Sequence, residues 1–342
     1  MHLEARAGVG VRRVLAGDFG GTRARVALFA LAPGALPVLE RQGVYPARDF
    51  AGPDEVAARF LAEVGSPELG AACFGVAGAV AGNRAWLTNL GWVVDGTGMA
   101  ERLGVPRFEL INDLVATAYG MAALGPDDLL DLNPSAVAAE GTAALIGVGT
   151  GLGMALLVRS GGKVVVAPSE AGHVELAARD EEEWALRRFV GERLGGRVSV
   201  ERVASGSGLR GIYEFLVAEG ELRPAPGMVE RVASEDAGAV IGQAALARSC
   251  PVAVATIRLF VSVLGSFAGD MALAAMARGG IYLGGGVPPR IAPLLADGTF
   301  LRSFTDKGRL STFVEPLPVR VILRQDTALL GAGLHAAALA GG

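Results

Sequence analysis

The stretch GDFGGTRARVALF (17–29) combines a glycine-rich turn with strand-like sequence on both sides. It follows the apolar run VLA (14–16). After the turn, RARVALF alternates polar and apolar residues before it becomes continuously apolar, as a strand entering a core does. The stretch therefore predicts a β-hairpin whose turn carries three glycines, an aspartate and a threonine.

A glycine-rich hairpin of this kind is a candidate phosphate site, because glycines let successive backbone N–H groups converge on phosphate oxygens. A Walker loop is excluded, because it needs a lysine followed by serine or threonine. The two lysines of the chain, Lys163 and Lys307, are followed by valine and glycine. A dinucleotide fingerprint occurs once, as GSGLRG (206–211), without a clear βαβ unit around it, and we expect a loop there before the helix IYEFLVAEG.

A second hairpin follows about 130 residues later, in AALIGVGTGLGMALLV (143–158). It repeats the plan of an apolar strand, a glycine/threonine turn and another strand. Two halves that each open with such a hairpin predict a duplicated architecture with a cleft between the halves, the alternative being a chance similarity of two turns. The later segment RGGIYLGGGVPPRIAPLL (278–295) predicts a strand, a triple-glycine turn and a helix.

The segments between the hairpins predict an α/β domain that ends near residue 122. The expected elements are helices at 54–65, 98–104 and directly after residue 113, and strands at 70–80 and 107–113. Further on, RDEEEWALRRFVGERLGG (179–196) predicts an amphipathic helix. We expect Asp180 to cap it and Glu183 to complete a capping box, which is a structural role and not a catalytic one.

Composition indicates a soluble two-domain protein. The chain has 342 residues, of which 51% are hydrophobic, and a formal net charge of −4, which argues against nucleic-acid and membrane-surface partners. The beginning of the chain does not resemble a signal peptide. The longest apolar stretch (252–277) is interrupted by Arg258 and Asp270, so it predicts a buried helix with Pro251 in its first turn. Cys73 and Cys250 are expected to be reduced, buried thiols of a cytoplasmic protein.

Polar residues at strand ends and in one loop suggest a site for a polyhydroxylated ligand such as a sugar. Asn112 and Asp113 end the strand FELIND, where a carboxylate would face a ligand crevice, although Asp113 could equally cap the next helix. Glu170 and His173 lie in SEAGHV, and Glu201 precedes a glycine-rich loop. Asp18 is suited to hold Mg²⁺ through water, unless it is an ordinary turn aspartate.

Seven motifs occur in an order that resembles bacterial ATP-dependent glucokinases, which are related to ROK kinases. They are GDFGGTRARVALF, LINDLVATA, GVGTGLGMALLV, EAGHVELA, VSVERVASGSGLRGIYEFL, IYLGGGVPPR and FTDKGRLSTFVEPLPV. The resemblance implies two ribonuclease-H-like domains of the actin-like ATPase fold, with the active site in the cleft between them. It implies a small domain of residues 1–122 completed by a C-terminal helix within 324–342, and a large domain of residues 123–323.

The resemblance also implies roles in phosphoryl transfer from ATP to the 6-hydroxyl of glucose, the first step of glycolysis. Asp113 would be the general base, and the other sugar hydroxyls would be bound by Asn112, Glu170, His173 and Glu201. The ATP phosphates would be held by Gly17, Asp18, Phe19, Gly20, Gly21, Thr22, Gly149, Thr150 and Gly151, and the adenosine would lie beside Gly284, Gly285 and Gly286. Mg²⁺ would be held at Asp18.

The chain departs from related families in ways that limit these expectations. It has VELAARDEEE after His173, where ROK kinases often carry a cysteine-rich zinc motif, so no zinc is expected. RQDTALLGAG (324–333) stands where Asn-Pro-Gly would precede the paired leucines, and TNLGWVV (88–94) is expected to help line the sugar site. The alternatives are a kinase for fructose, mannose or N-acetylmannosamine, or a non-catalytic sugar sensor or repressor. A homodimer in the cytoplasm is a family expectation.

Overall fold

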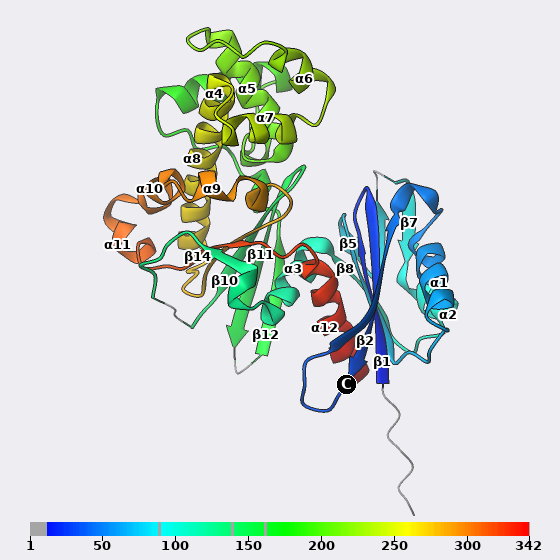
Figure 1. Cartoon of the computed structure of the whole chain (residues 1–342). Coiled ribbons are helices and arrows are strands. Elements are labelled where there is room, and N and C mark those ends of the chain that lie inside the picture. Colours follow the sequence, from blue (N-terminus) through cyan, green and yellow to red (C-terminus); the bar gives the residue numbers. More distant parts are fainter. Residues whose placement is uncertain (1–11, 88–89, 138–139, 161–162, 342) are drawn as a thin grey trace, which may run out of the picture. The chain divides into compact units, whose positions relative to one another are not determined.

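The two predicted hairpins lie in two separate α/β units of the chain (Figure 1). The computed structural model describes residues 12–87, 90–137, 140–160 and 163–341. Unit 1 consists of Met1–Leu124 with Asp326–Gly342, and unit 2 consists of Gly125–Gln325. Each unit is built around its own mixed sheet, so the predicted duplication of the α/β plan is confirmed.

Unit 1 contains a five-stranded sheet with the order β3-β2-β1-β4-β8. Its strands are β1 (Arg12–Phe19), β2 (Arg23–Leu31), β3 (Val38–Pro46), β4 (Ala71–Val76) and β8 (Phe108–Asn112). Strands β1, β2 and β3 form an antiparallel meander, whereas β1, β4 and β8 run parallel to one another. The carboxyl ends of the three parallel strands therefore meet at one edge of the sheet.

Helices cover both faces of this sheet. Successive residues of β1 point to opposite faces, and because β1 is apolar on both, each face packs against helices. Leu15 and Phe19 belong to a core with α1 (Pro53–Glu63) and α2 (Gly96–Leu103), and Val14 and Ala16 belong to a second core on the other face. That second core includes residues of α3 (Asp113–Gly120) and α12 (Thr327–Gly341). A small sheet adds β5 (Val80–Ala81), β6 (Arg84–Leu87) and β7 (Trp92–Asp95).

The C-terminal helix α12 packs directly on α3 and on strands β1 and β4, although these lie far from it in the sequence (Figure 1). Glycines make this close approach possible. A Cβ at Gly331 would lie 1.7 Å from the carbonyl oxygen of Ala116, and one at Gly120 would lie 2.0 Å from that of Thr327. His335 Nε2 also lies 2.8 Å from Glu109 Oε2, which joins α12 to β8.

Replacing Gly331 with alanine is expected to lower the free energy of unfolding by about 3 kcal/mol, the upper end of the usual cost of overpacking. The new methyl group would force α12 away from α3. Gly211→Ala is the matched control, because a Cβ there meets only Val190 Cγ2 at 3.9 Å, and it is expected to be neutral or slightly stabilising. Thermal and urea unfolding of both variants test the prediction, and equal stabilities would contradict it.

Unit 2 contains a six-stranded sheet with the order β12-β11-β10-β13-β14-β9. Its strands are β9 (Leu129–Asp131), β10 (Ala143–Val148), β11 (Leu152–Ser160), β12 (Lys163–Ser169), β13 (Gly280–Gly284) and β14 (Val319–Ile322). Strands β10, β13 and β14 are parallel. The helices are α4 (Glu181–Leu194), α5 (Gly206–Glu219), α6 (Met228–Ser234), α7 (Ala237–Leu246), α8 (Pro251–Ala274), α9 (Ala292–Leu295), α10 (Thr299–Thr305) and α11 (Ser311–Val314).

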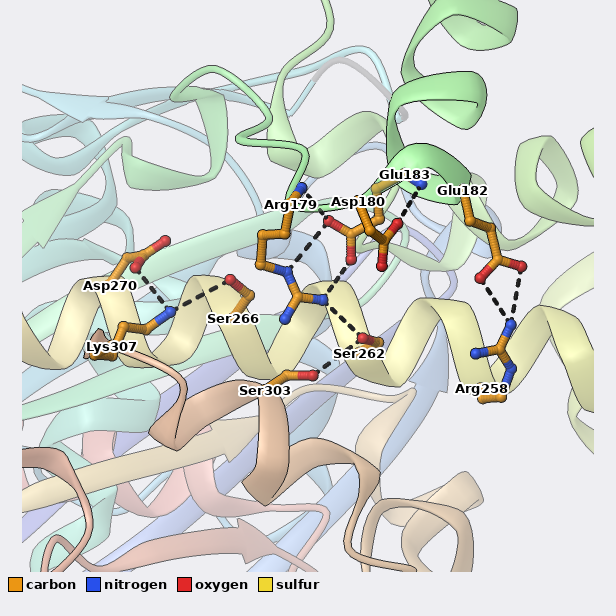
Figure 2. A network of polar contacts seen from close by, with 10 residues as sticks. All are labelled: Arg179, Asp180, Glu182, Glu183, Arg258, Ser262, Ser266, Asp270, Ser303 and Lys307. Atoms are coloured by element: carbon orange, nitrogen blue, oxygen red, sulfur yellow. Dashed lines mark hydrogen bonds and ion pairs between the residues drawn. The ribbon is translucent and has the colours of Figure 1, made fainter. Parts of the chain in front are cut away.

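Helix α8 is the apolar stretch of the sequence, and it is a core helix as expected. It is long and apolar enough to cross a membrane, but 78% of its most apolar window is buried inside the protein. The two charged residues that interrupt it are both paired (Figure 2). Arg258 Nη2 contacts both carboxylate oxygens of Glu182, at 2.9 and 2.8 Å, and Asp270 Oδ1 lies 3.0 Å from Lys307 Nζ. These ion pairs make the charges compatible with an otherwise apolar helix.

The start of α4 differs from the predicted capping box in one bond. Asp180 caps the helix as expected, accepting a hydrogen bond from the backbone N–H of Glu183 at 2.9 Å. The Glu183 carboxylate, however, accepts from the backbone N–H of Arg179 at 2.9 Å instead of that of Asp180. The reason is that Glu183 is buried and also pairs with the Arg179 guanidinium, which donates to Ser262 of α8 (Figure 2).

The GSGLRG stretch is helical, so the loop predicted there is wrong. It forms the first turns of α5, which begins at Gly206 because Ser205 caps it, accepting a hydrogen bond from the backbone N–H of Gly208 at 3.1 Å. Gly208 is required at this point, since a Cβ would lie 2.3 Å from the carbonyl oxygen of Val203.

Candidate active site

The acidic residues of unit 1 gather where its parallel strands end. In the register of the sheet, Asp18 of β1 is the partner of Gly75 in β4, and Val76 is the partner of Asn112 in β8. A Cβ at Gly75 would lie 3.0 Å from the Ala116 side chain, so this glycine allows α3 to begin close to β1 and β4. Asp18 and Asp113 are thereby brought to the same edge of the sheet.

The first hairpin is confirmed, but its turn is shorter than GDFGGT. Gly17, Asp18 and Phe19 belong to β1, and only Gly20, Gly21 and Thr22 form the turn, closed by a bond from Gly20 N–H to the Arg23 carbonyl at 3.0 Å. The alternative that Asp18 is a turn aspartate is therefore wrong. The Phe19 ring is buried against the Phe74 ring, and a Cβ at Gly17 would overlap both rings. Gly17 and Phe19 therefore belong to the packed core under the turn.

Asp18 is nearly buried, with 8% of its surface exposed, and is paired with an arginine that the sequence reasoning did not select. Arg25 Nη1 donates to Asp18 Oδ2 at 2.9 Å. Burial raises the pKa of Asp18 above its ordinary value, and the Arg25 charge opposes that shift. The hairpin register would have revealed this partner, because residues 18 and 25 are opposite each other when strand pairs are counted outward from the turn.

Asp113 is the first residue of α3, but the residue that caps this helix is Asn112. Asn112 Oδ1 accepts from the backbone N–H groups of Leu114 at 2.9 Å and Val115 at 3.4 Å, and its Nδ2 donates to the Gly78 carbonyl at 3.1 Å. The interpretation of Asp113 as the N-cap is therefore wrong, although its Oδ1 also accepts from Leu114 N–H at 2.8 Å.

The environment of Asp113 raises the pKa of its carboxyl to about 6. Burial is the main cause, and the nearby negative charge of Asp18 adds to it, while hydrogen bonds from Leu114 N–H and neighbouring groups oppose it. A carboxylate whose pKa is close to the working pH is well matched to accepting a proton in a reaction.

In unit 2, the second hairpin turn is tied to Glu201. The turn is closed by Gly149 N–H, which donates to the Gly151 carbonyl at 2.9 Å. Glu201 Oε2 accepts from the backbone N–H of Leu152 at 3.0 Å, and a Cβ at Gly151 would lie only 2.6 Å from the same oxygen. The glycine thus lets the carboxylate lie directly against the turn.

The loop SEAGHV brings His173 close to Glu201 and Glu170 close to His173. Its glycine, Gly172, is packed against β11, where a Cβ would lie 1.9 Å from the Leu152 carbonyl oxygen. His173 lies between the two acids, with Nε2 3.8 Å from Glu170 Oε2 and Nδ1 3.9 Å from Glu201 Oε1. The side chains of Glu170 and His173 are 88% and 56% exposed, so this cluster can reach a ligand.

The triple glycine also lies beside the second hairpin. Gly284 ends β13 and is the partner of Gly147 in β10. Gly285 has a φ of +89°, and a Cβ there would lie 2.4 Å from the Val148 carbonyl oxygen. Unit 2 therefore gathers Gly149–Gly151, Gly284–Gly286 and the Glu170, His173 and Glu201 cluster around the carboxyl ends of β10 and β13.

Three further points concern the sugar-site segment, metal ligands and cysteines. Thr88 and Asn89 of TNLGWVV lie outside the described residues. Within the part of the chain that the structure describes, no group of three or more His, Cys, Asp or Glu side chains could hold a metal ion. Cys73 and Cys250 are free and buried.

Comparison with known proteins identifies the family. The glucokinase family model matches residues 15–339. A glucokinase of Nostoc punctiforme is 36% identical over 338 residues, covering 95% of this chain and 99% of that protein. A glucokinase of Caulobacter vibrioides is also 36% identical, covering 94% of each chain.

Solved structures agree with this assignment. The crystal structure of a glucokinase from an Antarctic psychrotroph has a TM-score of 0.83 at 32% identity and covers 95% of this chain and 98% of that one. A ROK family glucokinase from Streptomyces griseus, solved in complex with glucose and AMPPNP, has a TM-score of 0.61 at 20% identity, covers 95% of this chain and 99% of that one, and shares the fold. The chain therefore belongs to the bacterial glucokinase family, enzymes of the actin-like sugar kinase fold that phosphorylate glucose with ATP.

Proposed function

We propose that Asp113 is the general base that this glucokinase uses to activate the 6-hydroxyl of glucose. The carboxylate takes the hydroxyl proton, the hydroxyl oxygen forms a bond to the γ-phosphorus of ATP, and the bond from that phosphorus to the β–γ bridging oxygen breaks to release ADP. The observation that carries this proposal is the position of Asp113 directly after β8, at the start of α3, with its pKa raised to about 6.

The remaining sugar hydroxyls are assigned to Glu170, His173 and Glu201. His173 lies 3.8 Å from Glu170 and 3.9 Å from Glu201, beyond hydrogen-bond distance, so these side chains keep hydrogen-bonding capacity for a ligand. Glu201 would use its Oε1, because its Oε2 accepts from the backbone N–H of Leu152. Asn112 has fewer groups left to bind the sugar, because its amide oxygen and one N–H already form hydrogen bonds within unit 1. Its remaining N–H is the group that would bind the sugar, and its main effect is to hold the start of α3 beneath Asp113.

The two hairpin turns are assigned to the phosphates of ATP, and Gly284–Gly286 to the adenosine. Gly20, Gly21 and Thr22 would contribute from unit 1, and Gly149, Thr150 and Gly151 from unit 2. Support comes from the exposed position of Gly21 and Thr22, from the close packing of the triple glycine against β10, and from the related Streptomyces griseus enzyme that was crystallised with AMPPNP.

Asp18 fits a water-mediated contact to Mg²⁺ and does not fit a bidentate one. Its Oδ2 is bound to Arg25 Nη1 at 2.9 Å, so one oxygen of the carboxylate faces another partner. Mg²⁺ usually keeps several waters and is held by one or two carboxylates and by substrate phosphates. When bound, the ion would neutralise the charge of the transferring phosphates, while Asp18 and Arg25 would fix where its hydration shell lies.

The proposed substrate is tested by measuring kcat/KM for glucose, fructose, mannose and N-acetylmannosamine in a coupled assay of ADP release. Glucose is expected to have the highest value. A higher value for another hexose would reassign the substrate, and sugar binding without ADP release would indicate a sensor.

Size-exclusion chromatography with light scattering would test the proposed homodimer. Fractionation of cells would test the proposed cytoplasmic location.

The rate should depend on pH through Asp113. Because the ionised carboxylate is the base, kcat/KM is expected to be constant above its pKa and to fall about tenfold for each pH unit below about 6. The profile should be measured from pH 4.5 to 8 at constant ionic strength, with saturating ATP, and with intrinsic fluorescence as a check that the protein stays folded. A rate that is constant down to pH 5 would contradict the assignment.

A further inference from the structure

The first turn of α5 holds the glycine turn of unit 2 in place. The backbone N–H of Gly206 donates to the Gly149 carbonyl at 2.8 Å, and that of Ser207 donates to the Thr150 carbonyl at 3.3 Å. Ser207 Oγ donates to the same Thr150 carbonyl at 2.9 Å and lies 2.9 Å from Ser205 Oγ. Two successive carbonyl groups of the turn are therefore directed toward α5.

This anchoring determines the direction of the next two N–H groups. In a trans peptide the C=O and the N–H of one peptide plane point in opposite directions, and the described residues contain no cis peptide bond. Holding the carbonyls of Gly149 and Thr150 thus turns the N–H groups of Thr150 and Gly151 away from α5. Neither of these N–H groups has a backbone hydrogen-bond partner among the described residues. Successive free N–H groups in a turn form an anion-binding concavity.

The glycine that begins α5 is required for this contact. A Cβ at Gly206 would lie 2.7 Å from the carbonyl oxygen of Gly149 and would push the turn away. Gly211, in the same GSGLRG stretch, has no such constraint, because a Cβ there would meet Val190 Cγ2 at an ordinary 3.9 Å. Gly206 is therefore needed for the contact with the turn, whereas Gly211 is not.

We propose that Ser207 is a positioning residue for ATP. It holds the Thr150 carbonyl so that the N–H groups of Thr150 and Gly151 face the phosphates. The N–H groups of Gly206 and Ser207 are engaged by the turn, so α5 acts through the turn and does not bind the phosphates itself. The inference rests on the proposed assignment of Gly149–Gly151 to the ATP phosphates.

Steady-state kinetics of Ser207→Ala test this role. At saturating glucose, kcat/KM for ATP is expected to fall about fivefold, the effect of one neutral hydrogen bond, with an unchanged KM for glucose. Ser207→Thr keeps the hydroxyl and should restore the wild-type value. Ser234→Ala is the matched control, because Ser234 Oγ also donates to a backbone carbonyl, that of Glu230 at 2.8 Å, at an exposed position of α6.

Two further measurements separate positioning from direct contact with ATP. In the absence of nucleotide, hydrogen exchange of the bonded N–H groups of this contact, those of Gly149, Gly206 and residue 207, should be faster in Ser207→Ala than in the wild type and in Ser207→Thr. A direct contact to ATP would leave this exchange unchanged and would overturn the proposal. Gly206→Ala should reduce kcat/KM for ATP further than Ser207→Ala, while Gly211→Ala should keep the wild-type value.

The outcomes also separate this role from the proposed function. A wild-type enzyme that phosphorylates glucose, together with an unchanged kcat/KM for ATP in Ser207→Ala, would refute the positioning role alone. A wild-type protein without ATP-dependent glucose phosphorylation would refute the proposed function and this role with it.

Discussion

Asp113→Asn is expected to lower kcat by roughly 10²–10⁴-fold, the usual contribution of a general base. The amide cannot accept the proton of the sugar hydroxyl, but its oxygen can still accept the hydrogen bond from Leu114 N–H that Asp113 Oδ1 accepts at 2.8 Å. The KM for glucose should therefore change little. The free energy of unfolding should stay the same or rise, because the variant removes a half-buried negative charge close to Asp18.

Asp180→Asn is the control for this experiment. Asp180 is also an aspartate at the start of a helix, where it accepts from the backbone N–H of Glu183, but it lies in the α4 cap and has no proposed role in catalysis. Its kcat should equal that of the wild type, since asparagine is as good an N-cap as aspartate. If Asp113→Asn kept wild-type activity, Asp113 would be only a structural residue of α3.

Gly172→Ala is expected to lower kcat/KM for glucose by about 10²-fold, the cost of misplacing binding groups by about 1 Å. A Cβ at this position would lie 1.9 Å from the Leu152 carbonyl oxygen, so the SEAGHV loop would have to move away from β11. His173 and Glu170 would move with the loop, whereas Glu201 is held separately by Leu152 N–H. The loss should appear mainly as a higher KM for glucose.

The prediction is checked by kinetics and by thermal unfolding of the same variant. Gly211→Ala again provides the control, as an alanine in unit 2 whose methyl group has space. A wild-type KM for glucose in Gly172→Ala would show that the loop does not bind the sugar. Loss of the folded state would be recognised by the thermal transition, and Glu170→Gln would then test the same loop without changing its packing, since the Glu170 side chain is 88% exposed.

Much of the fold could be predicted from the sequence because its signals are local. Alternating and continuous apolar residues, glycine clusters and helical spacing predicted both hairpins, the strands β4 and β8, and the helices α1, α2 and α8. The sequence failed at GSGLRG, where glycines suggested a loop. The Ser205 cap and the packing of Gly208 against Val203 make this stretch helical, and the packing could not be known from local sequence.

The sequence by itself determined the candidate site residues, since polar side chains at strand ends and in a glycine loop can be recognised without a structure. Only the tertiary structure decided how these residues are held. It showed that Asn112 caps α3, that Arg25 pairs with Asp18, and that α5 anchors the Gly149–Gly151 turn. The physical reason is that a hydrogen bond, a buried charge and a shifted pKa depend on which groups meet in space. The contact between α5 and the Gly149–Gly151 turn joins residues 57 apart in the chain, which local sequence patterns do not encode. The Asn112 cap and the Asp18–Arg25 pair are short-range, but finding them requires the position of the helix start and the register of the hairpin.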